Sequence, residues 1–427
     1  MKLPPSEWNS LFIPAFIKKL FPHKLMGKVE SFKCSRRTFN YFAALAVSSL
    51  LAPRVSYSEL LPPNKESENP DNYKKAVNSY NSMMRNFAMP GGLFRATYPF
   101  NIGIPSPNWD FSQAMAAVIE MNRLTSNVNH QHLQMVKKGL EKYWDSKPAK
   151  GLPAYNSTVK YPLISDPEKY LDDGAWDGLN LVRLFEYTGY KDAFLRGQEV
   201  FEFACANFDQ DSECMPGGIP WVQQTESQKN HDRNTVSNAP NAQLGLRLFQ
   251  LTGIKKYFGE AKKMYDWVNK HMHHPEEPWL YRDHVDGECA TKDTIWTYNQ
   301  GCMSGAGALL YKITEDRQYL DQSETTAQAA LDYFGEKELL SQPAQFNQIF
   351  FRNLLFLSSV TRSQELKNQI KNTVETYADN VWKNTNIRKK GDIFYFQGGN
   401  ALLLDQAAMV QIYSMLAQDS TNYHTLI

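Results

Sequence analysis

Apolar residues along the chain recur at helical spacing in pairs of segments that are separated by short turns. In the second segment of one pair, 257–268, the apolar residues fall on one face with lysines between them, which predicts a half-buried helix. The first segments, such as 179–187, are apolar on more than one side, so we expect them to be covered on more than one side. Most first segments end at a threonine, which makes the pairs variations on one helical hairpin.

Six such hairpins can be followed along the chain. Their helices are expected at 116–125 and 133–144, 179–189 and 194–203, up to 253 and 257–268, up to 314 and 319–334, up to 361 and 366–382, and 402–416 with 73–87. Six buried helices ringed by six half-buried ones predict an all-α fold, the (α/α)6 toroid or six-hairpin barrel, with short strands only in loops, for example near 393–396. An open helical solenoid is the alternative, and the near-complete count favours a closed ring.

The region before the first helix divides into a leader and a linker. Residues 1–58 resemble a twin-arginine export signal, because Arg36 and Arg37 precede an apolar run at 41–52 that is too short to span a bilayer comfortably. Met26 would give a leader of conventional length, and a general secretory signal or an uncleaved anchor are the alternatives. Residues 59–71 are rich in Pro, Asn and Glu, which predicts a linker to a single domain at 72–427.

We therefore expect an exported protein, periplasmic or extracellular, with no stable membrane span after processing. The 46 Lys and Arg residues nearly balance the 45 Asp and Glu residues, so the chain lacks the basic field that nucleic-acid-binding proteins use. Export permits disulfides among Cys205, Cys214, Cys289 and Cys302, but their spacing does not decide which pair forms. No C-x-x-C spacing occurs, and we expect neither a metal site nor a cofactor.

The inner helices of such a toroid begin at one end, so the segments just before them line one funnel, where function is expected. These segments are 108–110, 170–176, 233–238, 296–301, 346–348 and 395–400. They are rich in amides and aromatic residues, contain one acidic pair, and have almost no lysine. Amides and carboxylates that hydrogen-bond hydroxyls, together with aromatic faces, are typical of a site for a neutral sugar.

Among the residues of these segments, the acidic pair Asp172-Asp173 is the best candidate for catalysis. Cleavage of a glycosidic bond needs one carboxylic acid to protonate the leaving oxygen and a second carboxylate to attack or to activate water. Neighbouring Cα atoms lie about 3.8 Å apart, and diverging side chains easily reach the separation of about 5–5.5 Å found in retaining enzymes. The first anion also raises the pKa of the second carboxyl and keeps it protonated. The alternative is that both aspartates simply cap a helix.

Three segments, in this order along the chain, resemble glycoside hydrolase family 76, the endo-α-1,6-mannanases of bacteria and fungi. They are Tyr-Leu-Asp-Asp-Gly-Ala-Trp at 170–176, Asn-Thr-Val-Ser-Asn-Ala-Pro at 234–240 and Trp-Thr-Tyr-Asn-Gln-Gly at 296–301. Two further segments, 111–114 and 350–354, resemble the bacterial type of this family. The resemblance covers roughly 106–382 and implies an (α/α)6 fold, a retaining mechanism and consecutive catalytic aspartates.

Carried onto this chain, the resemblance implies that Asp172 is the nucleophile and Asp173 the acid/base. It also implies a set of sugar-binding residues, namely Trp109, Trp176, Asn234, Ser237, Asn238, Tyr298, Asn299 and Gln300. Helix capping is the alternative for the Asn-Ser-Asn group, and core packing is the alternative for Trp176. Arg233 stands where many members of the family have lysine, which leaves the distal subsites open.

The leading hypothesis is a monomeric glycosidase that cleaves, or transfers fragments of, an α-1,6-linked mannan or a mannose-containing oligosaccharide. Another glycan hydrolase or a polysaccharide lyase on the same fold is the second hypothesis. A lyase acts on uronates and would need Lys or Arg near the cleft, where the sequence offers little beyond Arg233. A glycan-binding protein whose catalysis has lapsed is the third hypothesis, and the intact Asp172-Asp173 pair argues against it.

Overall fold

The computed structural model describes residues 69–99, 103–125, 130–160, 167–225, 228, 230–396 and 398–427. The predicted export signal at 1–58 and most of the predicted linker lie outside the described residues. Helix α4 (Pro70–Phe87) begins inside the predicted linker, because the side chain of Asn69 accepts a hydrogen bond from the backbone N–H of Asn72 and Pro70 occupies the first helical position.

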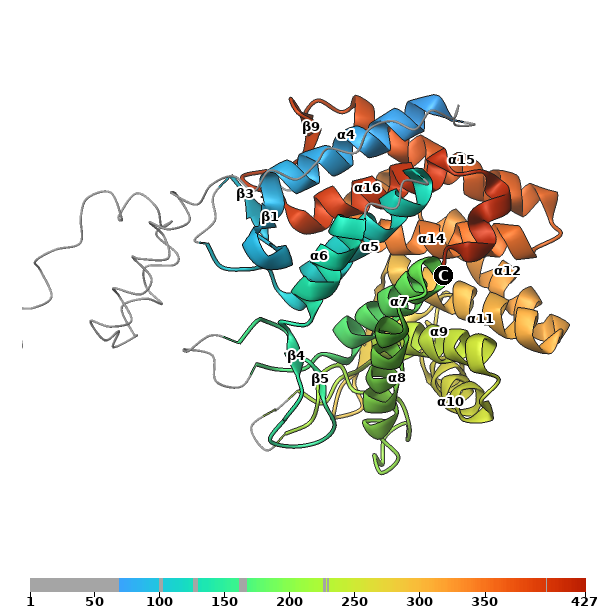
Figure 1. Cartoon of the computed structure of the whole chain (residues 1–427). Coiled ribbons are helices and arrows are strands. Elements are labelled where there is room, and N and C mark those ends of the chain that lie inside the picture. The colour runs from blue at the N-terminus through green and yellow to red at the C-terminus, as the bar shows by residue number, and fades with distance from the viewer. Residues whose placement is uncertain are drawn as a thin grey trace, which may run out of the picture. The chain divides into compact units, whose positions relative to one another are not determined.

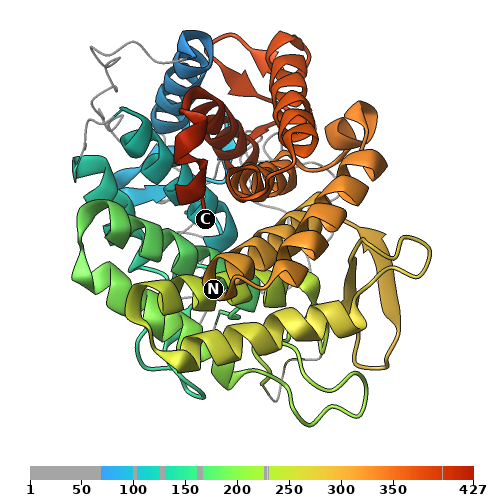
Figure 2. The same cartoon turned by 90° about the vertical axis from the view of Figure 1, so that its right-hand side faces the viewer.

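Twelve of the described helices form six hairpins, each with an inner and an outer member (Figures 1 and 2). The inner helices are α5 (Asn108–Thr125), α7 (Leu171–Thr188), α9 (Thr235–Thr252), α11 (Thr297–Thr314), α14 (Ala344–Val360) and α16 (Leu403–Ala417). The outer helices are α6 (His130–Leu140), α8 (Lys191–Ala206), α10 (Lys255–His271), α12 (Arg317–Tyr333), α15 (Gln364–Lys383) and α4. Each inner helix packs on the next, and α16 packs back on α5. This closed ring confirms the predicted (α/α)6 toroid.

Burial explains why the two kinds of helix differ in sequence. Helix α16 buries all but one of its residues, since neighbours surround it. Helix α10 buries a single face that includes Tyr257, Met264 and Val268, and its other face meets solvent. Glycine permits a close approach between two inner helices, because a Cβ on Gly301 of α11 would lie 2.6 Å from the Cα of Phe350 on α14.

Polar contacts tie α4 into the ring, although it lies far from its neighbours in the sequence. Lys75 is buried and forms ion pairs with Asp71 and with Asp379 on α15, at 2.7 and 3.0 Å. Its ammonium group also lies 5.7 Å from the centre of the Trp382 ring. The side chain of Gln406 on α16 donates to a backbone carbonyl of α4 at 2.8 Å. The N-terminal helix therefore completes the last hairpin, as the sequence predicts.

The described strands are short. They pair as β1 (Ala88–Met89) with β2 (Leu93–Phe94), β3 (Thr97–Tyr98) with β11 (Ala401–Leu402), β4 (Trp144–Asp145) with β5 (Ala154–Tyr155), and β9 (Arg388–Lys389) with β10 (Ile393–Phe394). A three-stranded sheet joins β6 (Arg233–Asn234), β7 (Arg282–Val285) and β8 (Thr291–Ile295). Short helices α13 (Glu336–Ser341), η2 (Pro90–Gly92) and η3 (Ser420–Thr425) complete the described elements. Within these residues no helix is both long and apolar enough to cross a membrane.

A disulfide joins two of the segments at the mouth of the ring. It links Cys214, in the loop after α8, to Cys289, in the turn between β7 and β8. Cys205 and Cys302 carry free thiols. The bond therefore ties together two loops that lie 75 residues apart in the sequence.

Candidate active site

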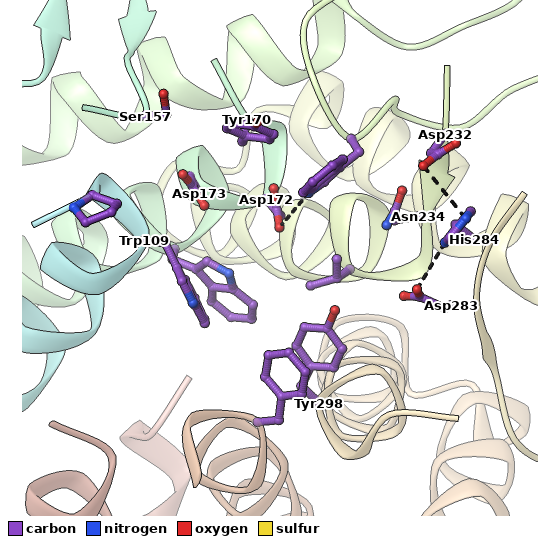
Figure 3. Close-up of a pocket in the computed structure, with 15 residues that line it drawn as sticks. Trp109, Ser157, Tyr170, Asp172, Asp173, Asp232, Asn234, Asp283, His284 and Tyr298 are labelled. Atoms are coloured by element: carbon purple, nitrogen blue, oxygen red, sulfur yellow. Dashed lines mark hydrogen bonds and ion pairs between the residues drawn. The ribbon is translucent and has the colours of Figure 1, made fainter. Parts of the chain in front are cut away.

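A cavity of about 440 Å³ opens at the end of the ring where the inner helices begin (Figure 3). Its lining residues come from five of the six inner-helix starts or the segments just before them, from strand β7 and from two loops. They are Pro107, Trp109, Ser157, Tyr170, Asp172, Asp173, Trp176, Trp221, Asp232, Asn234, Val236, Asp283, His284, Tyr298 and Phe346. The cavity is therefore the funnel that the toroid predicts, and its lining is aromatic and acidic.

Asp172 and Asp173 stand side by side in the first turn of α7 (Figure 3). The residue before the helix, Tyr170, makes no capping hydrogen bond with its side chain, and both carboxyls face the cavity. The helix start places positive partial charge and free N–H groups beside them, which favours the ionised form of a carboxyl. The helix start therefore holds the pair, and both carboxyls remain accessible from the cavity.

The environment of Asp172 favours partial ionisation. Its Oδ2 accepts a hydrogen bond from the indole N–H of Trp221 at 3.3 Å, while its Oδ1 is buried and has no hydrogen-bond partner among the described residues. Burial raises the pKa of Asp172 to about 6, the N–H groups of the helix start and of Trp221 oppose that rise, and the charge of Asp283 adds to it. The opposing effects leave the pKa of Asp172 raised less strongly than burial alone would raise it.

The environment of Asp173 favours the protonated form more strongly. Burial raises the pKa of Asp173 well above its usual range, and the charges of Asp172, Asp177 and Asp110 raise it further. No hydrogen bond from the described residues lowers the pKa of Asp173, whereas N–H groups lower that of Asp172. One carboxyl of the pair is therefore suited to remain ionised while its neighbour keeps its proton.

Aromatic rings form the walls beside the acidic pair. Trp109 and Trp176 lie with their ring centres 5.9 Å apart, and Tyr298 stacks on Phe346 at 3.9 Å with an angle of 9° between the rings. Trp176 is also part of the core, with 7% of its surface exposed. Flat apolar faces next to hydrogen-bonding groups are the surface that a sugar ring requires.

A second group of titratable residues lies on the wall formed by the β6–β7 pair. The Nδ1 atom of His284 lies 3.0 Å from a carboxylate oxygen of Asp283, and its Nε2 lies 3.7 Å from one of Asp232. Pairing of the strands places His284 opposite Asn234, whose Oδ1 is buried without a hydrogen-bond partner among the described residues. This wall offers carboxylate and amide oxygens to a polar ligand.

The structure brings six of the ten predicted site residues to the cavity, namely Asp172, Asp173, Trp109, Trp176, Asn234 and Tyr298. Four others, Ser237, Asn238, Asn299 and Gln300, are buried and do not line it. The side chain of Asn238 accepts from the backbone N–H of Ile219 at 2.8 Å, and that of Gln300 accepts from the backbone N–H of Tyr281 at 2.8 Å. These amides therefore support the loops just before Trp221 and Asp283.

Arg233 has a supporting position as well. Its guanidinium donates to the backbone carbonyls of Cys214, Met215 and Gly217, at 2.6, 2.7 and 2.8 Å. It therefore organises the loop that carries Cys214 and does not line the cavity.

The lining residues that sequence reasoning missed include Trp221, Asp232, Asp283 and His284. They lie outside the starts of the inner helices, in an irregular loop and on strand β7. The Asp286-Gly287 pair between β7 and β8 is a hairpin signal and could have indicated this strand pair. Trp221 and Asp232 lie in irregular chain, so no periodicity marks them.

The sequence profile of glycosyl hydrolase family 76 matches residues 67–422. The chain belongs to glycosyl hydrolase family 76. Curated relatives include a putative mannan endo-1,6-alpha-mannosidase of Schizosaccharomyces pombe, 28% identical over 216 residues, or 46% of this chain and 48% of that protein. The mannan endo-1,6-alpha-mannosidase DCW1 of Saccharomyces cerevisiae is 33% identical over 123 residues, or 27% of this chain and 26% of that protein. The chain thus matches about half the length, or less, of these relatives.

Solved structures of family 76 proteins share the fold. The mannosidase Bt3792 of Bacteroides thetaiotaomicron has a TM-score of 0.69 at 20% identity, covering 81% of this chain and 98% of that one. An inactive variant of an α-1,6-mannanase of Salegentibacter, solved with α-1,6-mannotriose, has a TM-score of 0.67 at 20% identity, covering 81% of this chain and 99% of that one. These family 76 structures confirm the toroid.

Proposed function

We propose that this family 76 protein is a glycosidase that cleaves α-1,6-linked mannan by a retaining mechanism with two carboxylates. The observation that carries the proposal is the placement of Asp172 and Asp173 side by side in an aromatic cavity, in surroundings that separate their ionisation. The names of the curated relatives and the mannotriose complex of the Salegentibacter enzyme support the choice of substrate.

In the first step, the carboxylate of ionised Asp172 attacks the anomeric carbon as protonated Asp173 gives its proton to the departing glycosidic oxygen. A covalent glycosyl-Asp172 ester and a shortened glycan result. In the second step, Asp173 takes a proton from water, or from a hydroxyl of an acceptor sugar, as that oxygen attacks the anomeric carbon and releases Asp172. Hydrolysis and transfer therefore use the same two residues and differ only in the acceptor.

The composition of the cavity favours a neutral glycan over an acidic one. Of the described residues that line it, none is Lys or Arg, and four are aspartates. A lyase would have to hold uronate carboxylates against these negative charges. A lapsed binding protein would have no need for two adjacent, partly buried carboxyls, which are costly to keep in a fold.

We also propose that the protein is exported, that it acts as a monomer, and that it belongs to the bacterial type of family 76. The disulfide between Cys214 and Cys289 supports an oxidising compartment. The segments 111–114 and 350–354 support the bacterial type, although the curated relatives are fungal. The twin-arginine motif itself lies outside the described residues.

The test is to assay Asp172→Asn and Asp173→Asn on α-1,6-mannooligosaccharides, with product sizing and NMR of the newly formed anomer. We expect each substitution to lower kcat/KM by at least about a thousand-fold, and the wild-type product to appear first as the α-anomer. The control is Asp266→Asn, which changes an exposed aspartate on α10. Wild-type turnover in either active-site variant, unsaturated products, or binding without cleavage would each refute the proposal.

A further inference from the structure

His284 occupies a special position in the cavity wall. Its two ring nitrogens point to two carboxylates, with Nδ1 3.0 Å from Asp283 and Nε2 3.7 Å from Asp232 (Figure 3). All three side chains line the cavity and are about a fifth exposed, at 22%, 17% and 21% for His284, Asp283 and Asp232. The contact with Asp283 is within hydrogen-bond distance and the contact with Asp232 is at ion-pair distance, and an imidazole presents an N–H group to both carboxylates only when both of its nitrogens carry protons.

The charges around His284 favour that doubly protonated form. The hydrogen bond with Asp283 is the main cause that raises the pKa of His284, and the charges of Asp283, Asp232 and Asp286 add to it against desolvation. On the neighbouring strand β8, the residue paired with His284 is Lys292, whose side chain is exposed to solvent. His284 is thus the one basic side chain among the described residues that line the cavity.

The wall is connected to the catalytic pair through Trp221. The backbone N–H of Trp221 donates to the carbonyl of Asp232 at 2.7 Å, and its indole donates to Asp172. Asp283 acts on Asp172 through space, because its charge raises the pKa of Asp172. Loss of the proton from His284 would leave the carboxylates of Asp232 and Asp283 without the shared cation that holds them beside one another.

We propose that protonated His284 is a positioning residue that holds Asp283 and Asp232 at the cavity wall, so that binding of the neutral sugar requires this proton. The inference rests on the proposed function, since it takes an α-1,6-linked mannooligosaccharide as the ligand. His284 itself transfers no proton in the reaction. Its charge keeps two carboxylates in place to accept hydrogen bonds from hydroxyl groups.

The sign of the pH dependence follows from linkage. If the bound state requires the proton, affinity is highest below the pKa of His284 and falls as pH rises through it, by about ten-fold per pH unit. Catalytic Asp173 also loses its proton as pH rises, so turnover alone would mix the two effects. Binding must therefore be measured without the catalytic carboxyls.

The experiment uses Asp172→Asn/Asp173→Asn protein and measures the Kd of α-1,6-mannotriose by calorimetry from pH 5 to pH 9. We expect affinity to fall about ten-fold or more across the upper part of this range, and His284→Gln in the same background to bind weakly and independently of pH. His424→Gln, which changes an exposed histidine on η3, is the control and should keep the parent's profile. A parent Kd that does not change with pH overturns the inference.

A second measurement needs no substitution at His284. NMR titration of the His284 imidazole in the same protein should show its pKa rise when mannotriose binds, because linkage is reciprocal. An unchanged pKa contradicts the inference even if His284→Gln fails to fold. If mannotriose does not bind at any pH, substrate and inference both fail; if it binds with a constant Kd, only the inference fails.

Discussion

Two neighbouring aspartates acquire different chemistry in this fold because different groups face them. Asp172 receives N–H groups from the helix start and from Trp221, which partly offset its burial, whereas burial and three neighbouring carboxyls act on Asp173 in the same direction. We therefore expect kcat/KM to rise with pH through about 6, as Asp172 ionises, and to fall at higher pH as Asp173 loses its proton.

The hydrogen bond from Trp221 can be tested through the acidic limb of that profile. Trp221→Phe keeps an aromatic wall but removes the indole donor to Asp172, so the pKa of Asp172 should rise and the acidic limb should move to higher pH. A hydrogen bond to a charged group is worth about 1.5–3 kcal/mol, which limits the shift to about one to two pH units. The control is Trp279→Phe, at an exposed tryptophan that does not line the cavity. An unshifted limb in Trp221→Phe would show that this contact does not tune Asp172.

Asp405, at the start of α16, is a buried carboxyl whose Oδ2 has no hydrogen-bond partner among the described residues. Burial raises its pKa to about 7, so the carboxyl contributes stability below the unfolded pKa and this contribution is lost as pH rises through about 7. Asp405→Asn should therefore raise the free energy of unfolding at pH 8 by on the order of 1–3 kcal/mol. Denaturant unfolding at pH 5 and pH 8 checks this, and an equal effect at both values would contradict it.

At the scale of the elements, the sequence predicts helices far better than strands. The pairs of inner and outer helices follow from local periodicity, and even 73–87 could be assigned to the last hairpin by counting. The Asp286-Gly287 turn marks the β7–β8 hairpin that carries His284, but β6 and β7 pair across about fifty positions, so no local pattern reveals that pairing. The motif around Asp172 can be recognised in the sequence alone. Trp221 lies in an irregular loop whose position depends on tertiary contacts, so the sequence does not predict that it lines the site.

The packing between two inner helices gives a matched pair of glycine substitutions. A Cβ on Gly301 would lie 2.6 Å from the Cα of Phe350, so Gly301→Ala should force α11 and α14 apart and lower stability by about 1–3 kcal/mol. Gly259, on the outer helix α10, has nothing within 4 Å of such a Cβ, so Gly259→Ala should stabilise by about 0.5–1 kcal/mol. Thermal unfolding of both variants measures the difference. Equal effects would mean that inner and outer helices do not differ in packing.

At the scale of the whole molecule, closure of the ring requires groups that connect helices across it. Glu120 on α5 is fully buried and forms ion pairs with Arg183 on α7 and with Arg352 on α14. Its second oxygen accepts from Gln418, which follows α16, and Arg352 donates to the backbone carbonyl of Leu426 at 2.9 Å. Figure 2 shows the C-terminal end of the chain near the middle of the ring. One carboxylate thus joins three inner helices and the end of the chain.

Replacement of that carboxylate should therefore weaken the ring as a unit. Glu120→Gln keeps the shape of the side chain but leaves the guanidinium groups of Arg183 and Arg352 buried without their shared anion, which should lower stability by about 3–5 kcal/mol. Glu199→Gln, which removes an exposed ion pair with Arg196 on α8, should change stability by less than about 1 kcal/mol. Because the inner helices form one closed ring, we expect denaturant unfolding to remain a single transition with a lower midpoint. A new intermediate in Glu120→Gln would instead show that the hairpins unfold as separate units.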